Sequence, residues 1–65
     1  MLMNQPPLIE RAFELARSGT FQSVSDIEAA LTADGYASVQ SHLAGPALRR
    51  DLRQLCLEAR RARRD

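Results

Sequence analysis

The chain has few of the residues that form disulfides or metal sites in small proteins. It contains one cysteine, Cys56, one histidine, His42, and no lysine or tryptophan. A single cysteine excludes an internal disulfide, and with a single histidine it excludes the usual zinc sites. We therefore expect no metal site and no other cofactor. A chain of 65 residues also buries only about 60% of its unfolded surface, so close helix packing or self-association must hold it together.

Long apolar runs are missing as well. No segment approaches the ~20 apolar residues of a membrane span. Residues 1–7 have neither the basic start nor the apolar run of a secretory signal. Because the lone cysteine also favours a reducing compartment, we expect one cytoplasmic domain, residues 1–65, that does not contact a membrane.

The sequence motifs of common catalytic sites are also absent. The sequence has no Ser/His/acid set, HExxH, P-loop or Gly-rich fingerprint. His42 stands alone, and so short a chain leaves little volume for a cleft. We expect no enzyme, no catalytic residue and no small-molecule substrate. The simplest interpretation of His42 is a surface or partly buried helix residue, and that of Cys56 is a small core residue.

What is present predicts an all-α fold. Three breaks divide the chain, at Gly19, Gly35 and Gly45-Pro46, and apolar residues between them recur at spacings of three and four. The pattern predicts a compact bundle of three longer helices and one short helix. The expected ranges are 7–18, 26–33, 38–44 and 46–63.

Several residues suit the ends of these helices. Gly19 suits the stop of the first helix. Ser25-Asp26-Ile27-Glu28 matches a capping box, so Ser25 is expected to cap the second helix. Ser38 can cap the short helix, and Tyr36 is expected to fold back on the core.

The last helix has the clearest pattern. Its apolar stripe places Cys56 on the flank and leaves Leu57 outside. The residues predicted for the stripe are Leu48, Leu52, Leu55, Ala59 and Ala62.

Charge is distributed unevenly along the chain. Residues 49–65 hold seven arginines and three acids, a balance of +4, whereas residues 1–48 have a balance of −3. One interpretation is a solvated helix face. The other is contact with phosphate groups, which the planar fork of arginine suits. The candidate nucleic-acid-binding residues are Arg49, Arg50, Arg53, Arg60, Arg61 and Arg64.

The order of signals in residues 23–57 resembles a helix-turn-helix of the winged-helix kind. Residues 25–31 look like its first helix and Asp34-Gly35-Tyr36 like the turn. Ala47-Leu48-Arg49-Arg50-Asp51-Leu52-Arg53-Gln54-Leu55 is similar to the recognition helix of the arginine-repressor family. The resemblance implies DNA binding and transcription regulation. In a departure from that family, we expect no β-wing. By this resemblance, Arg49, Arg50 and Arg53 face the groove of the DNA, and Ser38 or Gln40 lies near the DNA backbone.

We therefore expect a small intracellular binding protein whose partner is nucleic acid, contacted through the arginine-rich last helix. The alternative is a protein-interaction module or homo-oligomer that uses the same helix as its interface. In either case we expect the chain to form a homodimer through its last helices. Leu57, an apolar residue among arginines, would then lie at the centre of a contact between helices.

Overall fold

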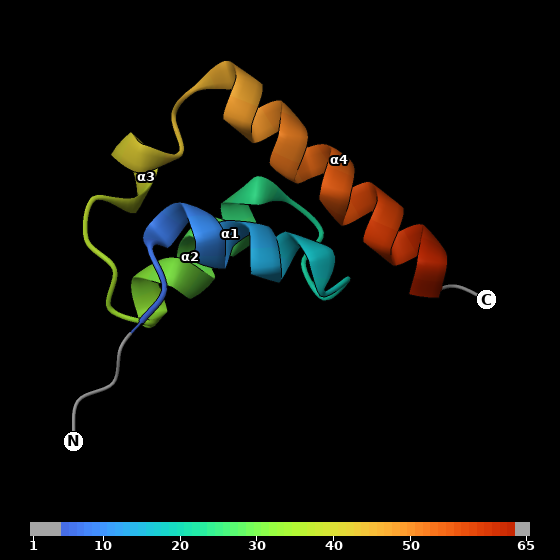
Figure 1. The fold of residues 1–65 in the computed structure, drawn as a ribbon, viewed down its shortest axis with the longest axis horizontal. Helices are drawn as coiled ribbons and strands as arrows, with labels where there is room; N and C mark the ends of the chain where they lie inside the picture. The colour runs from blue at the N-terminus through green and yellow to red at the C-terminus, as the bar shows by residue number, and fades with distance from the viewer. Residues whose placement is uncertain (1–4, 64–65) are drawn as a thin grey trace.

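A computed structural model describes residues 5–63, and it describes side chains for residues 5–62. This part of the chain is all-α, as the apolar spacing predicted, and contains no strand (Figure 1). Three longer helices and one short helix follow one another. They are α1 (Leu8–Arg17), α2 (Val24–Ala33), α3 (Val39–His42) and α4 (Pro46–Arg63).

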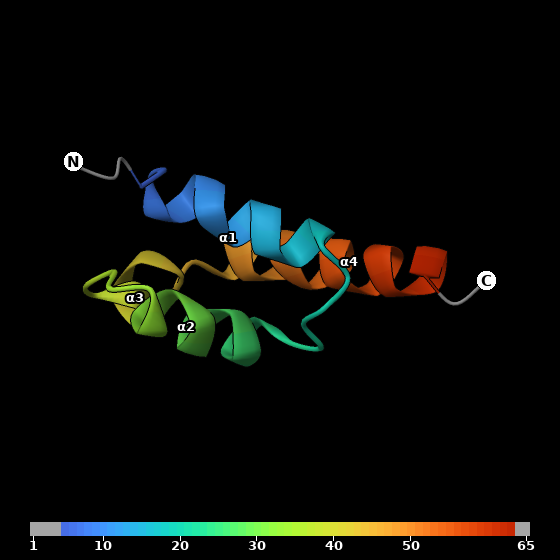
Figure 2. The ribbon, with the colours of Figure 1, turned by 90° about the horizontal axis from the view of Figure 1, so that it is seen from below.

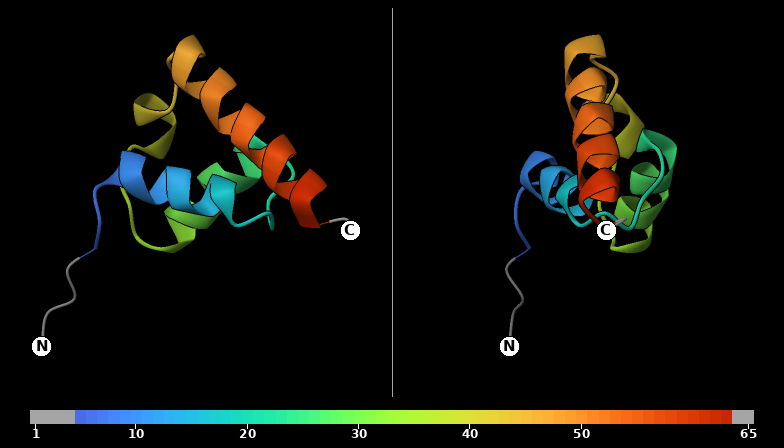
Figure 3. Two further views of the ribbon diagram at one scale, coloured as in Figure 1. Left: turned by 45° about the vertical axis from the view of Figure 1, so that its right-hand side comes forward. Right: turned by 90° about the vertical axis from the view of Figure 1, so that its right-hand side faces the viewer.

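The helices form a flat arrangement with extents of 39 × 29 × 15 Å. The helices α1 and α2 lie beside each other, and α4 crosses over the seam between them (Figures 2 and 3). The short α3 continues from the end of α2 and leads the chain up to the start of α4. No helix in the described range is long and apolar enough to cross a membrane.

The core draws residues from all four helices and from the turn after α3. Its largest fully buried side chains are Ile27, Leu31, Leu43, Leu52 and Cys56. Cys56 is a core residue, as predicted, because it is only 1% exposed. The buried side of α4 therefore extends over the flank of the predicted stripe on which Cys56 lies. Leu48 and Leu55 are only partly buried and Ala62 is exposed. The buried side of α4 is therefore centred on Leu52 and Cys56.

The start of α2 differs from the sequence-based expectation. Ser23, not Ser25, is the N-cap, and its hydroxyl accepts a hydrogen bond of 3.2 Å from the backbone N–H of Asp26. Ser25 lies inside the helix and is exposed. The earlier start brings Val24 into the core, where it is 6% exposed. Burial of this apolar side chain, which the cap pattern alone does not reveal, selects the first serine.

The other helix ends follow the predicted breaks with small shifts. Pro7 and Ser18 flank α1 as caps, and Gly19 adopts the left-handed conformation (φ 79°) expected of a helix stop. Ser38 precedes α3 with φ 56° and makes no side-chain cap hydrogen bond, so its predicted capping role was wrong. The short α3 ends at His42, before the predicted 44, whereas α4 has the predicted bounds.

The segment before α1 is tied to the turn after α2. The hydroxyl of Tyr36 donates to the carbonyl of Pro6 at 2.6 Å, and the side-chain amide of Gln5 donates to the carbonyl of Asp34 at 2.9 Å. The ring of Tyr36 packs against the core, as expected. These two hydrogen bonds therefore hold together residues that lie 29 and 30 positions apart in the sequence.

Replacing the observed cap should destabilise the fold. We expect Ser23→Ala to lower the free energy of unfolding by about 1 kcal/mol, because the N–H of Asp26 loses its partner. Ser25→Ala is the matched control and should be nearly neutral, since Ser25 is exposed and caps nothing in the described structure. Urea denaturation followed by circular dichroism measures both values. A larger loss for Ser25→Ala would contradict the assignment of the cap.

Candidate nucleic-acid interface

The arginines of α4 occupy one side of the helix. At 3.6 residues per turn, those from Arg49 to Arg61 fall within a sector of about 120°. Leu57 lies inside this sector, while the acidic residues Asp51 and Glu58 lie outside it. We call Arg49, Arg50, Arg53, Leu57, Arg60 and Arg61 the basic sector. Arg64, which was also predicted to bind nucleic acid, lies outside the described residues.

Four of these arginines face water. Arg50, Arg53, Arg60 and Arg61 are exposed. The ion pairs formed within residues 5–62 involve Arg11 and Arg49, and none involves these four. Their guanidinium groups are therefore available to an external anion.

Arg49 has a different environment. Its Nη1 donates to Oε2 of Glu28 at 2.7 Å and to the carbonyl of Leu43 at 3.3 Å. The Glu28 side chain is only 14% exposed, so this charged hydrogen bond is partly shielded from water. One arginine thus fastens the start of α4 to α2 and to the end of α3. The sequence grouped Arg49 with Arg50 and Arg53, but the structure gives it an internal partner that the other two lack.

An open groove of about 390 Å³ runs between α4 and the start of α2. We call it the α2–α4 groove. Arg50 and Arg53 line one wall and Leu57 lies at one end of their row. The other wall consists of residues 22–25, the segment that enters α2. The groove lining is Gln22, Ser23, Val24, Ser25, Pro46, Arg49, Arg50, Arg53 and Leu57.

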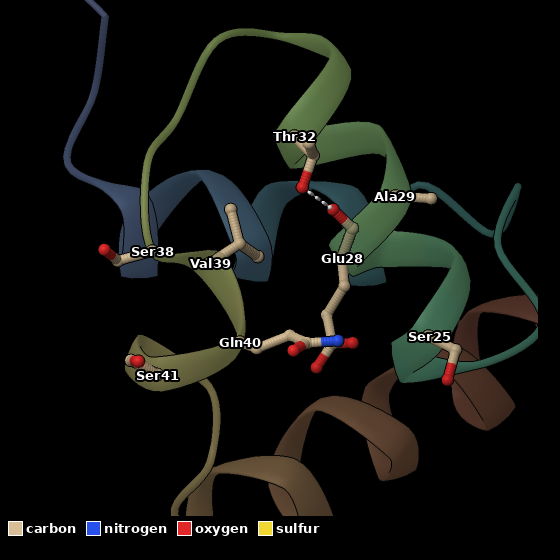
Figure 4. A pocket seen from close by; sticks show the side chains of 8 residues that line it. All are labelled: Ser25, Glu28, Ala29, Thr32, Ser38, Val39, Gln40 and Ser41. Atoms are coloured by element: carbon tan, nitrogen blue, oxygen red, sulfur yellow. Dashed lines mark hydrogen bonds between the residues drawn. The ribbon is translucent and has the colours of Figure 1, made fainter.

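A second groove, of about 590 Å³, lies between α2 and α3 (Figure 4). Its lining is polar, and the charged side chain among its lining residues is Glu28. Figure 4 shows the side chains of Glu28 and Gln40 among those that line this groove. Ser38 and Gln40, which the resemblance placed near a nucleic-acid backbone, line this groove. A carboxylate there makes the α2–α3 groove a poor place for phosphate.

The two reactive side chains, Cys56 and His42, have different surroundings. Burial raises the pKa of the Cys56 thiol, an effect that Arg60 opposes and Asp26 reinforces. The thiol therefore stays protonated near neutral pH, and its burial makes it inaccessible to reagents in solution. His42 is exposed at the end of α3. Within the described residues no three metal-ligating side chains gather.

The chain matches no protein-family model, no curated protein and no solved structure. The function is therefore inferred from the charge and the geometry of α4 and its neighbours.

The Arg49–Glu28 pair should contribute more to stability than a surface pair. We expect Glu28→Gln to lower the free energy of unfolding by about 1 kcal/mol, because the partly buried ion pair becomes a hydrogen bond between the Arg49 guanidinium and a neutral amide oxygen. The matched control is Glu14→Gln, which removes the 3.0 Å pair with Arg11 on the surface of α1 and should have a much smaller effect. Urea denaturation of the two variants gives the comparison. Equal losses would show that Arg49 is only another surface charge.

Proposed function

We propose that this protein binds nucleic acid through the basic sector of α4. The observation that carries the proposal is the set of four exposed arginines on one side of a single helix, free of internal ion pairs within residues 5–62. Arginine binds phosphate with two parallel hydrogen bonds, which gives both affinity and orientation.

The spacing of these arginines supports more than one phosphate contact. Arg50 and Arg61 are eleven residues apart, which is about 16 Å along a helix that rises 1.5 Å per residue. A DNA strand presents one phosphate per ~3.4 Å of duplex axis. The pair Arg50 and Arg53 and the pair Arg60 and Arg61 can therefore reach different phosphates.

The composition of the sector favours contact with the sugar-phosphate backbone. It contains no aromatic side chain on which bases would stack. Phosphate contacts position a protein on nucleic acid and carry little sequence information. From the helix-turn-helix resemblance we retain α4 as the helix that contacts nucleic acid, together with a cytoplasmic role in transcription regulation. The short α3 stands between α2 and α4, so the tight turn of that motif is replaced by a longer connection.

Salt dependence tests the proposal. We expect the wild-type chain to bind a fluorescein-labelled random duplex at ~20 mM salt, with log affinity falling by about 0.9 per log salt for each phosphate contact. Arg53→Gln combined with Arg60→Gln should reduce that slope by about 1.8. The matched control is Arg11→Gln with Arg17→Gln on α1, which should leave the slope nearly unchanged. Fluorescence anisotropy measures all three. Absence of binding to both duplex and single strand at ~20 mM salt would refute the proposal.

A homodimer through α4 is the second candidate, and Leu57 is the observation that favours it. Leu57 is 44% exposed, whereas the other large apolar side chains in the described part of the chain are buried or half-buried. A symmetric pairing centred on Leu57 has an electrostatic difficulty. An antiparallel pair of α4 helices would set Arg53 of one copy against Arg61 of the other, and a parallel pair would set each arginine against itself. Like charges at such positions are destabilising, so the geometry favours an anionic partner.

Sedimentation separates the two candidates. In the absence of nucleic acid at tens of micromolar, we expect the mass of one 7.2 kDa chain. A mass near twice this value that Leu57→Glu returns to one chain would favour the homodimer. Leu55→Glu is unsuitable as a control because Leu55 packs against the core, so Gln54→Glu on the exposed side of α4 serves instead.

A further inference from the structure

The arginines of the basic sector are not equivalent, because only some of them face a second wall. Arg50 and Arg53 are three positions apart and line the α2–α4 groove together. Arg60 and Arg61 belong to the same side of α4 but do not line the groove. A phosphate beside Arg50 and Arg53 would meet side chains of two segments of the protein, α4 and the start of α2.

The second wall carries neutral hydrogen-bond donors. The amide of Gln22 and the hydroxyl of Ser25 are exposed. The hydroxyl oxygen of Ser23 accepts from the N–H of Asp26, so its own proton is available to another acceptor. These three side chains line the same groove as Arg50 and Arg53, so the groove offers hydrogen-bond donors from two segments of the protein.

Size and charge of the groove agree with such an occupant. Its volume of about 390 Å³ is about thirteen times the ~30 Å³ of a water molecule, enough for a phosphate with its sugar. The lining residues include three arginines and no acidic residue. Pro46 and Leu57 add apolar surface against which a sugar ring can lie.

We infer that the α2–α4 groove binds a phosphate group of the nucleic acid, held between Arg50 and Arg53 of α4 and the side chains of Gln22, Ser23 and Ser25. The inference rests on the proposed function and adds the residues at the start of α2 to the interface. Arg49 and Glu28 act as positioning residues, since their ion pair fixes the distance between the two walls.

A pair of isosteric variants tests the second wall. Gln22→Glu places a negative charge in the groove, while Gln40→Glu places the same charge in the α2–α3 groove. Both glutamines are exposed, and thermal melts of the two variants establish that each keeps its fold. In anisotropy titrations of labelled duplex and single strand at ~50 mM salt, we expect Gln22→Glu to weaken binding roughly tenfold and Gln40→Glu less than about twofold.

Two further measurements identify the bound group. Arg50→Gln with Arg53→Gln should weaken binding more than Arg60→Gln with Arg61→Gln, although each removes two charges from α4. Inorganic phosphate added to the ¹⁵N-labelled chain should shift the Gln22 side-chain amide and the Nε–H signals of Arg50 and Arg53, and leave those of Arg60 and Arg61 in place.

The outcomes distinguish this inference from the function on which it rests. Equal weakening by Gln22→Glu and Gln40→Glu, with wild-type binding intact, would overturn the groove and leave nucleic-acid binding standing. Displacement of the labelled strand by poly-glutamate at equal charge concentration would overturn phosphate as the ligand and favour an acidic protein. If nucleic acid does not bind the wild-type chain, the proposed function and the groove assignment fail together.

Discussion

The seating of α4 on the other helices determines every other property of the candidate interface. Leu52 and Cys56 are fully buried, and they fix the rotation of the helix about its own axis. Once that rotation is set, the period of 3.6 residues leaves no freedom in where the remaining side chains point. The arginines then lie on the side next to the start of α2, and the acidic residues Asp51 and Glu58 lie on the opposite side. The same contacts hold the fold together and orient the surface.

The pair between Arg49 and Glu28 completes this arrangement at one end of α4. The carbonyl of Leu43 shares the same guanidinium, so α2, the end of α3 and α4 meet at one side chain. A chain this short has few other ways to fix an 18-residue helix whose first turn extends beyond the body of the molecule (Figure 1). An arginine that looks like its neighbours in the sequence thus has a structural role, and its neighbours remain free for a partner.

Local pattern was enough to predict α4 and the all-α fold, because the apolar and basic stripes of a long amphipathic helix are periodic. It failed at the start of α2, where Ser23 and Ser25 are each followed three positions later by an acidic residue. Only the burial of Val24 decides between them, and that burial is a tertiary contact. The α2–α4 groove was missed for a similar reason, since nothing near Gln22 in the sequence indicates that Arg50 and Arg53 lie opposite.

The opposite charges on the two edges of α4 also affect how the molecule meets a partner. Arginines on one edge and Asp51 and Glu58 on the other give α4 a lateral dipole, although the net charge of the protein is only +1. In the field of any polyanion such a dipole is turned before contact, so that the arginine edge arrives first. Orientation during approach raises the fraction of productive collisions, which makes the association rate, more than the lifetime of the complex, the quantity most sensitive to ionic strength.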